Sequence, residues 1–344
     1  DIKIVSKLLE SEINVKSFLN KNNIDYGVGL QPINKSTTKP IIDNEISNLQ
    51  FIRPEKIERF YTDKSKYSSI NSLLKNKETI ETYLKYYSVD NIQDLPKINV
   101  FRRITGKNIY EGPMLLTKEG LKDNQLCFSY LDHSVAYNST VLGFKSRDKS
   151  QLRFLSCLLN SELATYFLLL ISNSWGIERE RIKPNEVYEF PIVNNQVIFN
   201  KLITIHKKIE SKIKTTILEV DYSKLEEDIN NMIYQLYNID SSEKQSIKDF
   251  IKFSANLFHK QEKSSTLLPA LQKQVNVFSS LITNEINSFL DKQGLFANAT
   301  IFNSINRFSP LMMIKISFSE KKNETFQSED FIDEELKKLD KHLW

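Results

Sequence analysis

The chain has 344 residues, of which 40% are hydrophobic and 26% are charged, with a formal net charge of +4. These values exclude a wholly disordered chain, and the length allows more than one hydrophobic core, so we expect two or three domains. The small positive charge neither indicates nor excludes a nucleic-acid partner, because a basic face can be balanced by acidic residues elsewhere.

The cysteines and the first residues point to an intracellular piece of a longer protein. Cys127 and Cys157 are isolated in the sequence, which predicts no disulfide framework and no metal site and fits a reducing cytoplasm. The chain begins at Asp1 without a signal-peptide pattern, so we expect a cut inside a longer polypeptide. The apolar run over 152–171 contains Arg153 and other polar residues, so we expect a buried helix and no membrane contact.

The first part of the chain predicts a connecting helix followed by a mixed domain. Apolar residues recur at helical spacing over 1–21, which we interpret as a connector. Residues 22–193 then contain short β-prone runs, at 114–116, 126–130 and 135–144, separated by glycine and proline. We therefore expect a small sheet in this domain.

A long apolar helix is the clearest element of that domain. Asp148 and Gln151 fit the N-cap and N3 positions of a capping box, and leucines recur at helical spacing as far as Leu170. The sequence then changes to alternating charge at 175–181, Trp-Gly-Ile-Glu-Arg-Glu-Arg. We expect one long helix that covers the sheet and ends at a polar loop.

The rest of the chain predicts two further domains. Residues 194–260 carry helical stripes typical of a small helical bundle, and 261–344 predict a helix followed by two strands, over 296–302 and 311–318. The predicted fold class is therefore α+β: a mixed recognition domain with a small sheet under a long helix, then a helical bundle, then a small α+β C-terminal domain.

Catalytic and metal-binding motifs are not found in the sequence. The four histidines are dispersed, and there is no P-loop and no nucleophile elbow. The Gly-Val-Gly at 27–29 lacks the third glycine and the helix of a dinucleotide-binding loop, so we interpret it as a turn. The acidic residues and the lysine at 219–224 are spaced as in some nucleases, but they span a predicted junction between two helices, so we do not interpret them as a nuclease motif. Asp132 and His133 are neighbours in a predicted strand, so we expect their side chains on opposite faces and not as an acid–base pair.

Several landmarks occur in the order found in one protein family. They are Gly27-Val28-Gly29-Leu30, Gly112-Pro113-Met114-Leu115-Leu116 with Lys118 and Gly120, Leu158-Leu159-Asn160-Ser161, the 175–181 loop, Phe190-Pro191, and the helical run 225–237 with Asp240 and Glu243. In this order they resemble the target-recognition region of bacterial adenine-N6 DNA methyltransferases of restriction-modification systems, including enzymes that fuse methylase and specificity parts. The resemblance covers residues 22–260, and 264–344 match only loosely.

The resemblance implies a division of labour with a part of the protein outside this chain. A parent enzyme of this kind would flip an adenine out of the duplex and methylate its N6 from S-adenosylmethionine. The family's Phe-x-Gly-x-Gly and Asn-Pro-Pro-Tyr motifs do not occur in this sequence. We therefore expect the cofactor and the chemistry in an upstream methyltransferase domain of the same polypeptide, and no cofactor and no metal here. Double-stranded DNA is the expected further partner, and an associated nuclease is left open.

Recognition of DNA needs contacts to phosphates for position and to base edges for sequence. The expected DNA-binding residues are Arg102, Arg103, Lys107, Lys118, Lys122, Arg179, Arg181 and Lys183. The expected structural signature is Trp175, Gly176, Glu178 and Glu180, because arginines that alternate with glutamates favour an ion-pair network over base reading. Two other functions stay open from the sequence: a protein-interaction scaffold that does not bind DNA, and a nuclease with an unfamiliar motif.

Overall fold

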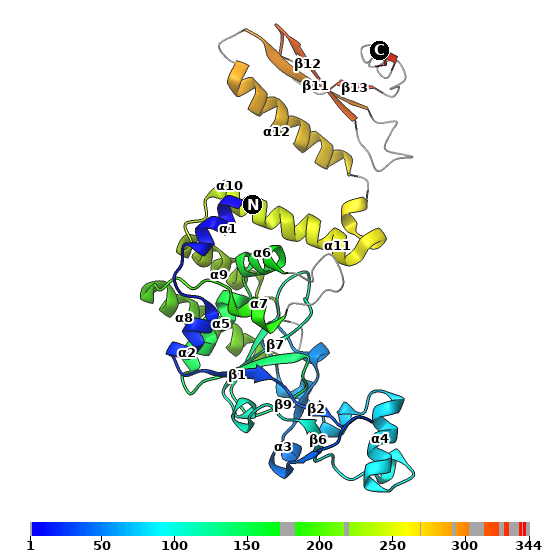
Figure 1. Cartoon of the computed structure of the whole chain (residues 1–344). Coiled ribbons are helices and arrows are strands. Elements are labelled where there is room, and N and C mark those ends of the chain that lie inside the picture. Colours follow the sequence, from blue (N-terminus) through cyan, green and yellow to red (C-terminus); the bar gives the residue numbers. More distant parts are fainter. Residues whose placement is uncertain are drawn as a thin grey trace. The chain divides into compact units, whose positions relative to one another are not determined.

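The chain folds into two compact units, Asp1–His259 (unit 1) and Lys260–Trp344 (unit 2). The computed structural model describes residues 2–172, 183–216, 220–268, 270–290, 294–302, 313–322, 327–329, 337–338 and 340–341. Both units combine helices with small sheets (Figure 1), so the predicted α+β class is confirmed.

The strands of unit 1 form three sheets. They are β1 (Asp25–Val28), β2 (Gln31–Pro32), β3 (Ile41–Ile42), β4 (Phe51–Ile52), β5 (Phe60–Tyr61), β6 (Val100–Arg103), β7 (Met114–Lys118), β8 (Phe128–Leu131), β9 (Ala136–Tyr137) and β10 (Val141–Lys145). The main sheet has the order β1-β10-β7-β8-β5 and is antiparallel except for the β5–β8 pair. A second sheet has the order β2-β6-β3, and β4 pairs with β9.

Helices surround these sheets. Those of unit 1 are α1 (Ile2–Leu9), α2 (Val15–Lys21), α3 (Asn44–Asn48), α4 (Lys77–Tyr87), α5 (Lys149–Leu159), α6 (Glu162–Ile171), α7 (Pro184–Tyr188), α8 (Gln196–Thr215), α9 (Ser223–Leu236) and α10 (Ser241–Asp249), and α11 (Asn256–Lys260) ends just beyond it. Short 3-10 turns include η2 (Lys64–Lys66) and η5 (Lys107–Tyr110), and a π-helical stretch spans Phe250–Ala255. In Figure 1, α3 and α4 lie with β2 and β6 at the end of unit 1 away from α9 and α10.

The main sheet separates two hydrophobic cores because its strands are buried on both faces. Leu115 of β7 packs in a core that it shares with α1, α5, α6 and the helices after residue 194. Its neighbours Met114 and Leu116 pack in a second core, with α4 and the β2-β6-β3 sheet. This alternation is the two-residue period of a strand. The strands expected at 114–116, 126–130 and 135–144 are confirmed as β7, β8 and β9–β10.

The single long helix expected after Asp148 is wrong, because the helix breaks at Asn160. Its two arms, α5 and α6, meet at an angle of 68°. The Asn160 side chain leaves the helical run and pairs with β8: its Nδ2 donates to the carbonyl of Phe128 at 2.7 Å, and its Oδ1 accepts from the Phe128 N–H at 2.8 Å. Ser161 then caps α6 by accepting from the N–H of Ala164 at 3.1 Å.

The expected capping box at the start of α5 is also wrong. Asp148 accepts from the N–H of Ser150 at 2.8 Å, one residue earlier than a capping box requires. The Gln151 side chain bonds instead to Ser146 and to Asn22, and so ties α5 to α2. The prediction that the helix covers the sheet is confirmed, since α5 packs against β7 and β8.

No single helix in the described ranges has the length and apolar character to cross a membrane, although the bent pair α5–α6 passes that test when its arms are combined.

Unit 2 is one helix against a three-stranded sheet. The helix α12 (Gln272–Leu290) packs on β11 (Phe296–Phe302), which pairs with β12 (Met313–Ser319) and β13 (Gln327–Glu329). The helix and the antiparallel strand pair expected in this region are confirmed. The helix buries small residues, among them Ser279 and Thr283, and leaves Phe278 53% and Phe289 75% exposed.

Candidate nucleic-acid interface

The turn at 138–140, between β9 and β10, organises one edge of unit 1. Asn138 fixes the turn, because its Oδ1 accepts from the Thr140 hydroxyl at 2.7 Å and from the Thr140 N–H at 3.3 Å. The chain passes close by after β1: the Gly29 N–H donates to Val141, and the Leu30 N–H donates to Tyr137. The interpretation of 27–29 as a turn is therefore wrong, since Gly27 lies in β1 and the chain then runs on to pair with residues 137–141.

Polar side chains from distant parts of the sequence meet at this turn. The Gln31 side chain of β2 donates to the Ser139 hydroxyl at 3.4 Å. Arg103 of β6 lies directly opposite Gln31 in the β2–β6 ladder, so the two side chains share one face of that sheet. Sequence reasoning did not select Gln31 or Ser139, because nothing in the local pattern shows that residues so far apart become neighbours.

Two further basic residues flank the same turn. Lys118 ends β7, and the N–H of the next residue, Glu119, donates to the carbonyl of Thr140 at 3.3 Å. Pro184, which begins α7, lines a small crevice together with Lys118 and Thr140. Lys183 precedes it and is exposed. We call the surface formed by Gln31, Arg103, Lys118, Ser139 and Lys183 the 138–140 edge.

The basic side chains of this edge, and that of the neighbouring residue Arg102, have no acidic partner among the described residues. Arg102 and Arg103 are exposed, and neither forms an ion pair or a side-chain hydrogen bond with another residue that the structure describes. Within the same ranges, the side chains of Lys118 and Lys183 also have no acidic partner, although the Lys183 backbone N–H donates to Glu186 at 2.7 Å. Cations without carboxylate partners are suited to phosphate oxygens, and glutamine and arginine are suited to base edges.

Lys107 and Lys122 have a different environment from the other predicted contacts. Lys107 lies 2.8 Å from Asp43 and 3.2 Å from Glu45, at the start of α3. Burial acts to raise the pKa of Asp43, but the Ile46 N–H and Lys107 outweigh it, so the pKa is lowered and the carboxylate stays charged. Lys122 pairs with Glu58. Both lysines are therefore paired with carboxylates, unlike Lys118 and Lys183.

The predicted structural signature lies outside the described residues. This applies to Trp175, Gly176, Glu178 and Glu180, and to the predicted DNA contacts Arg179 and Arg181. Their roles therefore remain predictions from the sequence.

Asp132 and His133 form a hydrogen bond, contrary to the expectation from strand alternation. His133 Nδ1 lies 2.8 Å from Asp132 Oδ1, and His133 Nε2 lies 2.9 Å from the hydroxyl of Tyr67. The expectation failed because β8 ends at Leu131, so neither residue belongs to a strand. Lys214 of α8 donates to Asp132 at 2.7 Å.

The charges of that cluster are balanced within it. Burial acts to raise the pKa of Asp132, but hydrogen bonds from Lys214 and His133 lower the pKa to about 2. Lys214 also binds Glu210, which Arg153 holds through two N–H groups at 2.9 and 3.0 Å. Asp132 and Glu210 each have a cationic partner, so the cluster joins the residues after β8 to α8.

The two cysteine thiols lie in environments that do not activate them as nucleophiles. Burial raises the pKa of both the Cys127 and the Cys157 thiol, which disfavours the nucleophilic thiolate. Within the described ranges, no group of three or more His, Cys, Asp or Glu side chains is placed to hold a metal ion.

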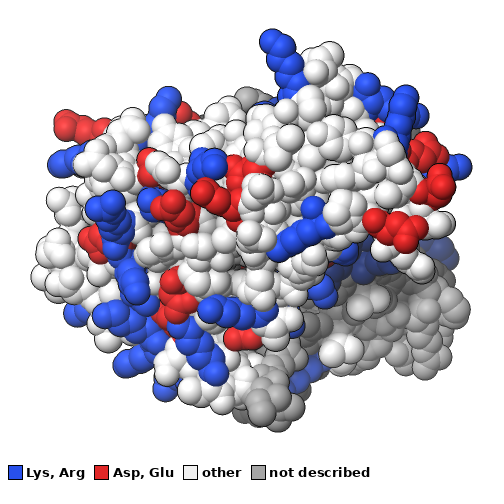
Figure 2. Space-filling model, turned by 90° about the horizontal axis from the view of Figure 1, so that it is seen from below, with Lys and Arg blue, Asp and Glu red and all other residues white. Residues whose placement is uncertain are grey.

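The distribution of charge does not by itself define an interface. Figure 2 shows both signs of charge on the face seen from below, with a group of Lys and Arg side chains towards its lower left. A face of mixed charge gives no single field to steer a polyanion. The pairing state of each cation is therefore the more informative property.

Comparison with known proteins gives matches among solved structures. No protein family profile matches the sequence, and no curated protein matches it. Among solved structures, the chain is similar to the Type IIL restriction-modification enzyme MmeI in complex with DNA, with a TM-score of 0.40 and 13% sequence identity. The likeness covers 69% of this chain and 36% of the MmeI chain, so the chain spans about a third of that enzyme's length.

Proposed function

We propose that this chain is a sequence-specific recognition module for double-stranded DNA, belonging to an S-adenosylmethionine-dependent adenine-N6 DNA methyltransferase of a restriction-modification system. The observation that carries the proposal is the 138–140 edge, where Arg103 and Gln31 share a face and Lys118 and Lys183 flank them. The family resemblance of residues 22–260 supplies the methyltransferase context.

The residues of the edge divide by chemistry into two roles. Gln31 and Arg103 have side chains that form paired hydrogen bonds with adenine and guanine edges in the major groove. Lys118 and Lys183, as mobile point charges, suit phosphates on either side and would fix the position of the duplex. In this proposal methyl transfer and cofactor binding belong to the upstream domain, and this chain selects the site.

The rigidity of the edge supports a role in reading bases. Arg103 and Gln31 lie on strands. The side chain of Asn138 fixes the 138–140 turn, which contacts both Gln31 and the residue after Lys118. Side chains on fixed backbone lose less conformational freedom on binding, so they discriminate bases better than side chains on mobile loops.

A selection from a pool of randomised DNA duplexes tests the proposal. The full chain is incubated with the pool at about physiological salt, where specific binding exceeds non-specific binding by roughly 10³-fold or more, and the retained duplexes are sequenced after several rounds. Enrichment of one motif is the expected result. No retention at any salt concentration would favour the scaffold function, and cutting that requires a divalent cation would favour the nuclease.

A further inference from the structure

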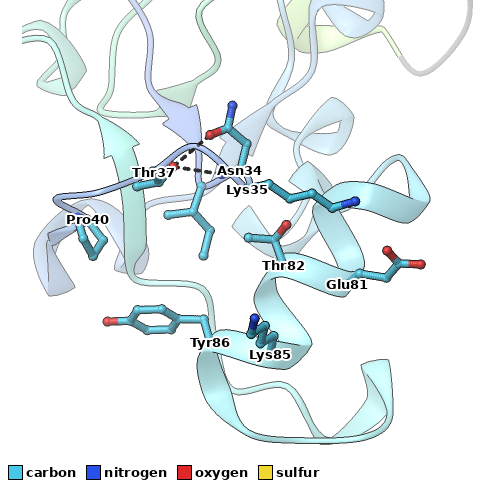
Figure 3. A pocket seen from close by; sticks show the side chains of 9 residues that line it. Asn34, Lys35, Thr37, Pro40, Glu81, Thr82, Lys85 and Tyr86 are labelled. Atoms are coloured by element: carbon cyan, nitrogen blue, oxygen red, sulfur yellow. Dashed lines mark hydrogen bonds between the residues drawn. The ribbon is translucent and has the colours of Figure 1, made fainter.

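A second candidate site lies in the α4 region of unit 1, and its lining shares no residue with the 138–140 edge. An open pocket of about 540 Å³ lies between the loop 33–40 and α4, a volume within the usual range of small-molecule sites. Figure 3 shows the Tyr86 ring extending from α4 beneath the loop towards Pro40, with Lys35 and Lys85 on the side away from Pro40. The pocket thus has one flat, apolar side and one cationic side.

The loop wall of the pocket is held in shape by its own hydrogen bonds. Asn34 Oδ1 accepts from the Thr37 hydroxyl at 3.0 Å and from the Ser36 hydroxyl at 2.9 Å, and the Thr37 N–H donates to the Asn34 carbonyl at 2.9 Å. The Ile33 N–H donates to the hydroxyl of buried Tyr83 on α4 at 3.4 Å. The loop and the helix are therefore fixed relative to each other, so the pocket exists before a ligand arrives.

The aromatic side of the pocket is also fixed. The Tyr86 ring packs edge-on against Tyr87 at 5.3 Å between centroids. Tyr87 is itself tied to Asn99, because its hydroxyl donates to the Asn99 side chain at 2.9 Å. Tyr86 nevertheless remains 42% exposed, which is high for an aromatic ring with a packed neighbour. A supported and exposed ring is available for stacking against a planar group.

The cationic side carries charge that no neighbour neutralises. Lys35 and Lys85 are exposed, and neither forms an ion pair with another residue in the ranges that the structure describes. The one acidic residue of the lining, Glu81, lies 3.9 Å from Lys77, one helical turn earlier on α4, so the two lysines outnumber the lining carboxylate. The lining therefore favours an anion.

We propose that this pocket binds a nucleotide, with its base on Tyr86 and its phosphate near Lys85 and Lys35. A planar ring joined to a phosphate matches the flat and cationic sides together, whereas a simple anion would leave Tyr86 exposed. The nucleotide has two possible sources, a free mononucleotide or one nucleotide of a DNA strand. The site does not depend on the 138–140 edge, so it stands even if that edge does not bind a duplex.

Calorimetric titration of the full chain tests this proposal. The probes are deoxyadenosine monophosphate, deoxyribose 5-phosphate, which lacks the base, and a short single-stranded oligodeoxynucleotide. We expect saturable binding of the mononucleotide or the oligonucleotide and at least tenfold weaker binding of deoxyribose 5-phosphate, because base stacking contributes on the order of one factor of ten or more. Binding of the mononucleotide assigns a free ligand, and binding of the oligonucleotide alone assigns a strand.

Three substitutions locate the binding. Tyr86→Ala and Lys85→Gln are each expected to weaken it roughly tenfold, and Lys35→Gln on the loop provides a second charge test if a change in α4 impairs folding. Lys66→Gln is the matched control, since this lysine of η2 is exposed, forms no ion pair with a described residue and lies outside the pocket lining. Binding that is the same in all four variants, or no binding of any probe by the folded wild-type chain, would overturn the proposal.

Discussion

Asn160 pairs its side-chain amide with both backbone groups of Phe128, so that one residue between two helices completes the hydrogen bonding of a strand. Both residues are fully buried. Replacing the amide would leave a buried N–H and a buried carbonyl without partners, and each such group costs about 1–3 kcal/mol. We therefore expect Asn160→Ala to lower the free energy of unfolding by roughly 2–4 kcal/mol.

Urea denaturation followed by circular dichroism measures this change. Asn20→Ala is the matched control, because Asn20 is exposed on α2 and its side chain forms no hydrogen bond with a described residue. A loss for Asn160→Ala no larger than that of the control would show that the pairing with β8 does not stabilise unit 1.

Gly29 predicts a second, steric effect on stability. A Cβ atom added at Gly29 would lie 2.1 Å from the backbone oxygen of Tyr137, too close for any real contact. Since backbone must move to relieve it, we expect Gly29→Ala to destabilise unit 1 by about 2–3 kcal/mol or to prevent folding. Gly120→Ala is the control, because a Cβ there meets nothing within 4 Å. Equal thermal midpoints for the two variants would contradict the prediction.

His206 predicts a specific dependence of stability on pH. Burial between Phe60 and Tyr130 lowers the pKa of His206 to about 3, against about 6.5 in an unfolded chain. The neutral side chain is favoured in the folded state, so its contribution is complete above pH 6.5 and is lost as the pH falls towards 3, where the unfolded chain binds a proton that the folded one does not.

We expect this titration to remove on the order of 2 kcal/mol of stability between pH 7.5 and pH 5.0. Urea unfolding of the wild-type chain and of His206→Gln at the two pH values isolates the contribution. The variant should be less stable at pH 7.5 and should lose less on acidification. An identical pH dependence in both proteins would exclude His206 as its source.

The proposed DNA contacts differ in what their substitution should do. Arg103→Gln and Lys118→Gln remove charges of the 138–140 edge that have no acidic partner among the described residues, so each should weaken duplex binding and reduce the salt slope by about one. Lys107→Gln removes a charge already neutralised by Asp43 and Glu45, so the slope should change little. Binding isotherms measured at several salt concentrations distinguish the variants. A slope that falls only in Lys107→Gln would place the interface at α3.

The elements of the main sheet could be predicted from the sequence because their signals are local. The runs at β7, β8 and β10 are rich in apolar residues, and Gly112, Pro113 and Gly120 mark where β7 begins and ends. The helix break could not be predicted, because Phe128, whose backbone bonds to the Asn160 side chain, lies 32 residues earlier in the chain. A hydrophobic pattern identifies a helical run but does not show which polar residue leaves it for a distant partner.

The candidate site could be predicted only in part, for the same reason. Arg102 and Arg103 were identifiable as basic residues beside a glycine, but the contact of Gln31 with Ser139 joins positions 108 residues apart. The bond between Asp132 and His133 was excluded by strand geometry, although β8 had already ended at Leu131. The residue types at a site can be read from a sequence, whereas their neighbours depend on the tertiary fold.

The bend at Asn160 also sets a length scale for unit 1. Continued as one straight rod, the 11 residues of α5, the 10 of α6 and the two between them would extend for roughly 35 Å, about the diameter of a small domain. Bent by 68°, neither arm exceeds about 17 Å. Because α6 buries every side chain from Leu163 to Leu169, it needs neighbours on all sides, and only a short arm can be enclosed so completely by α7, α9 and α10.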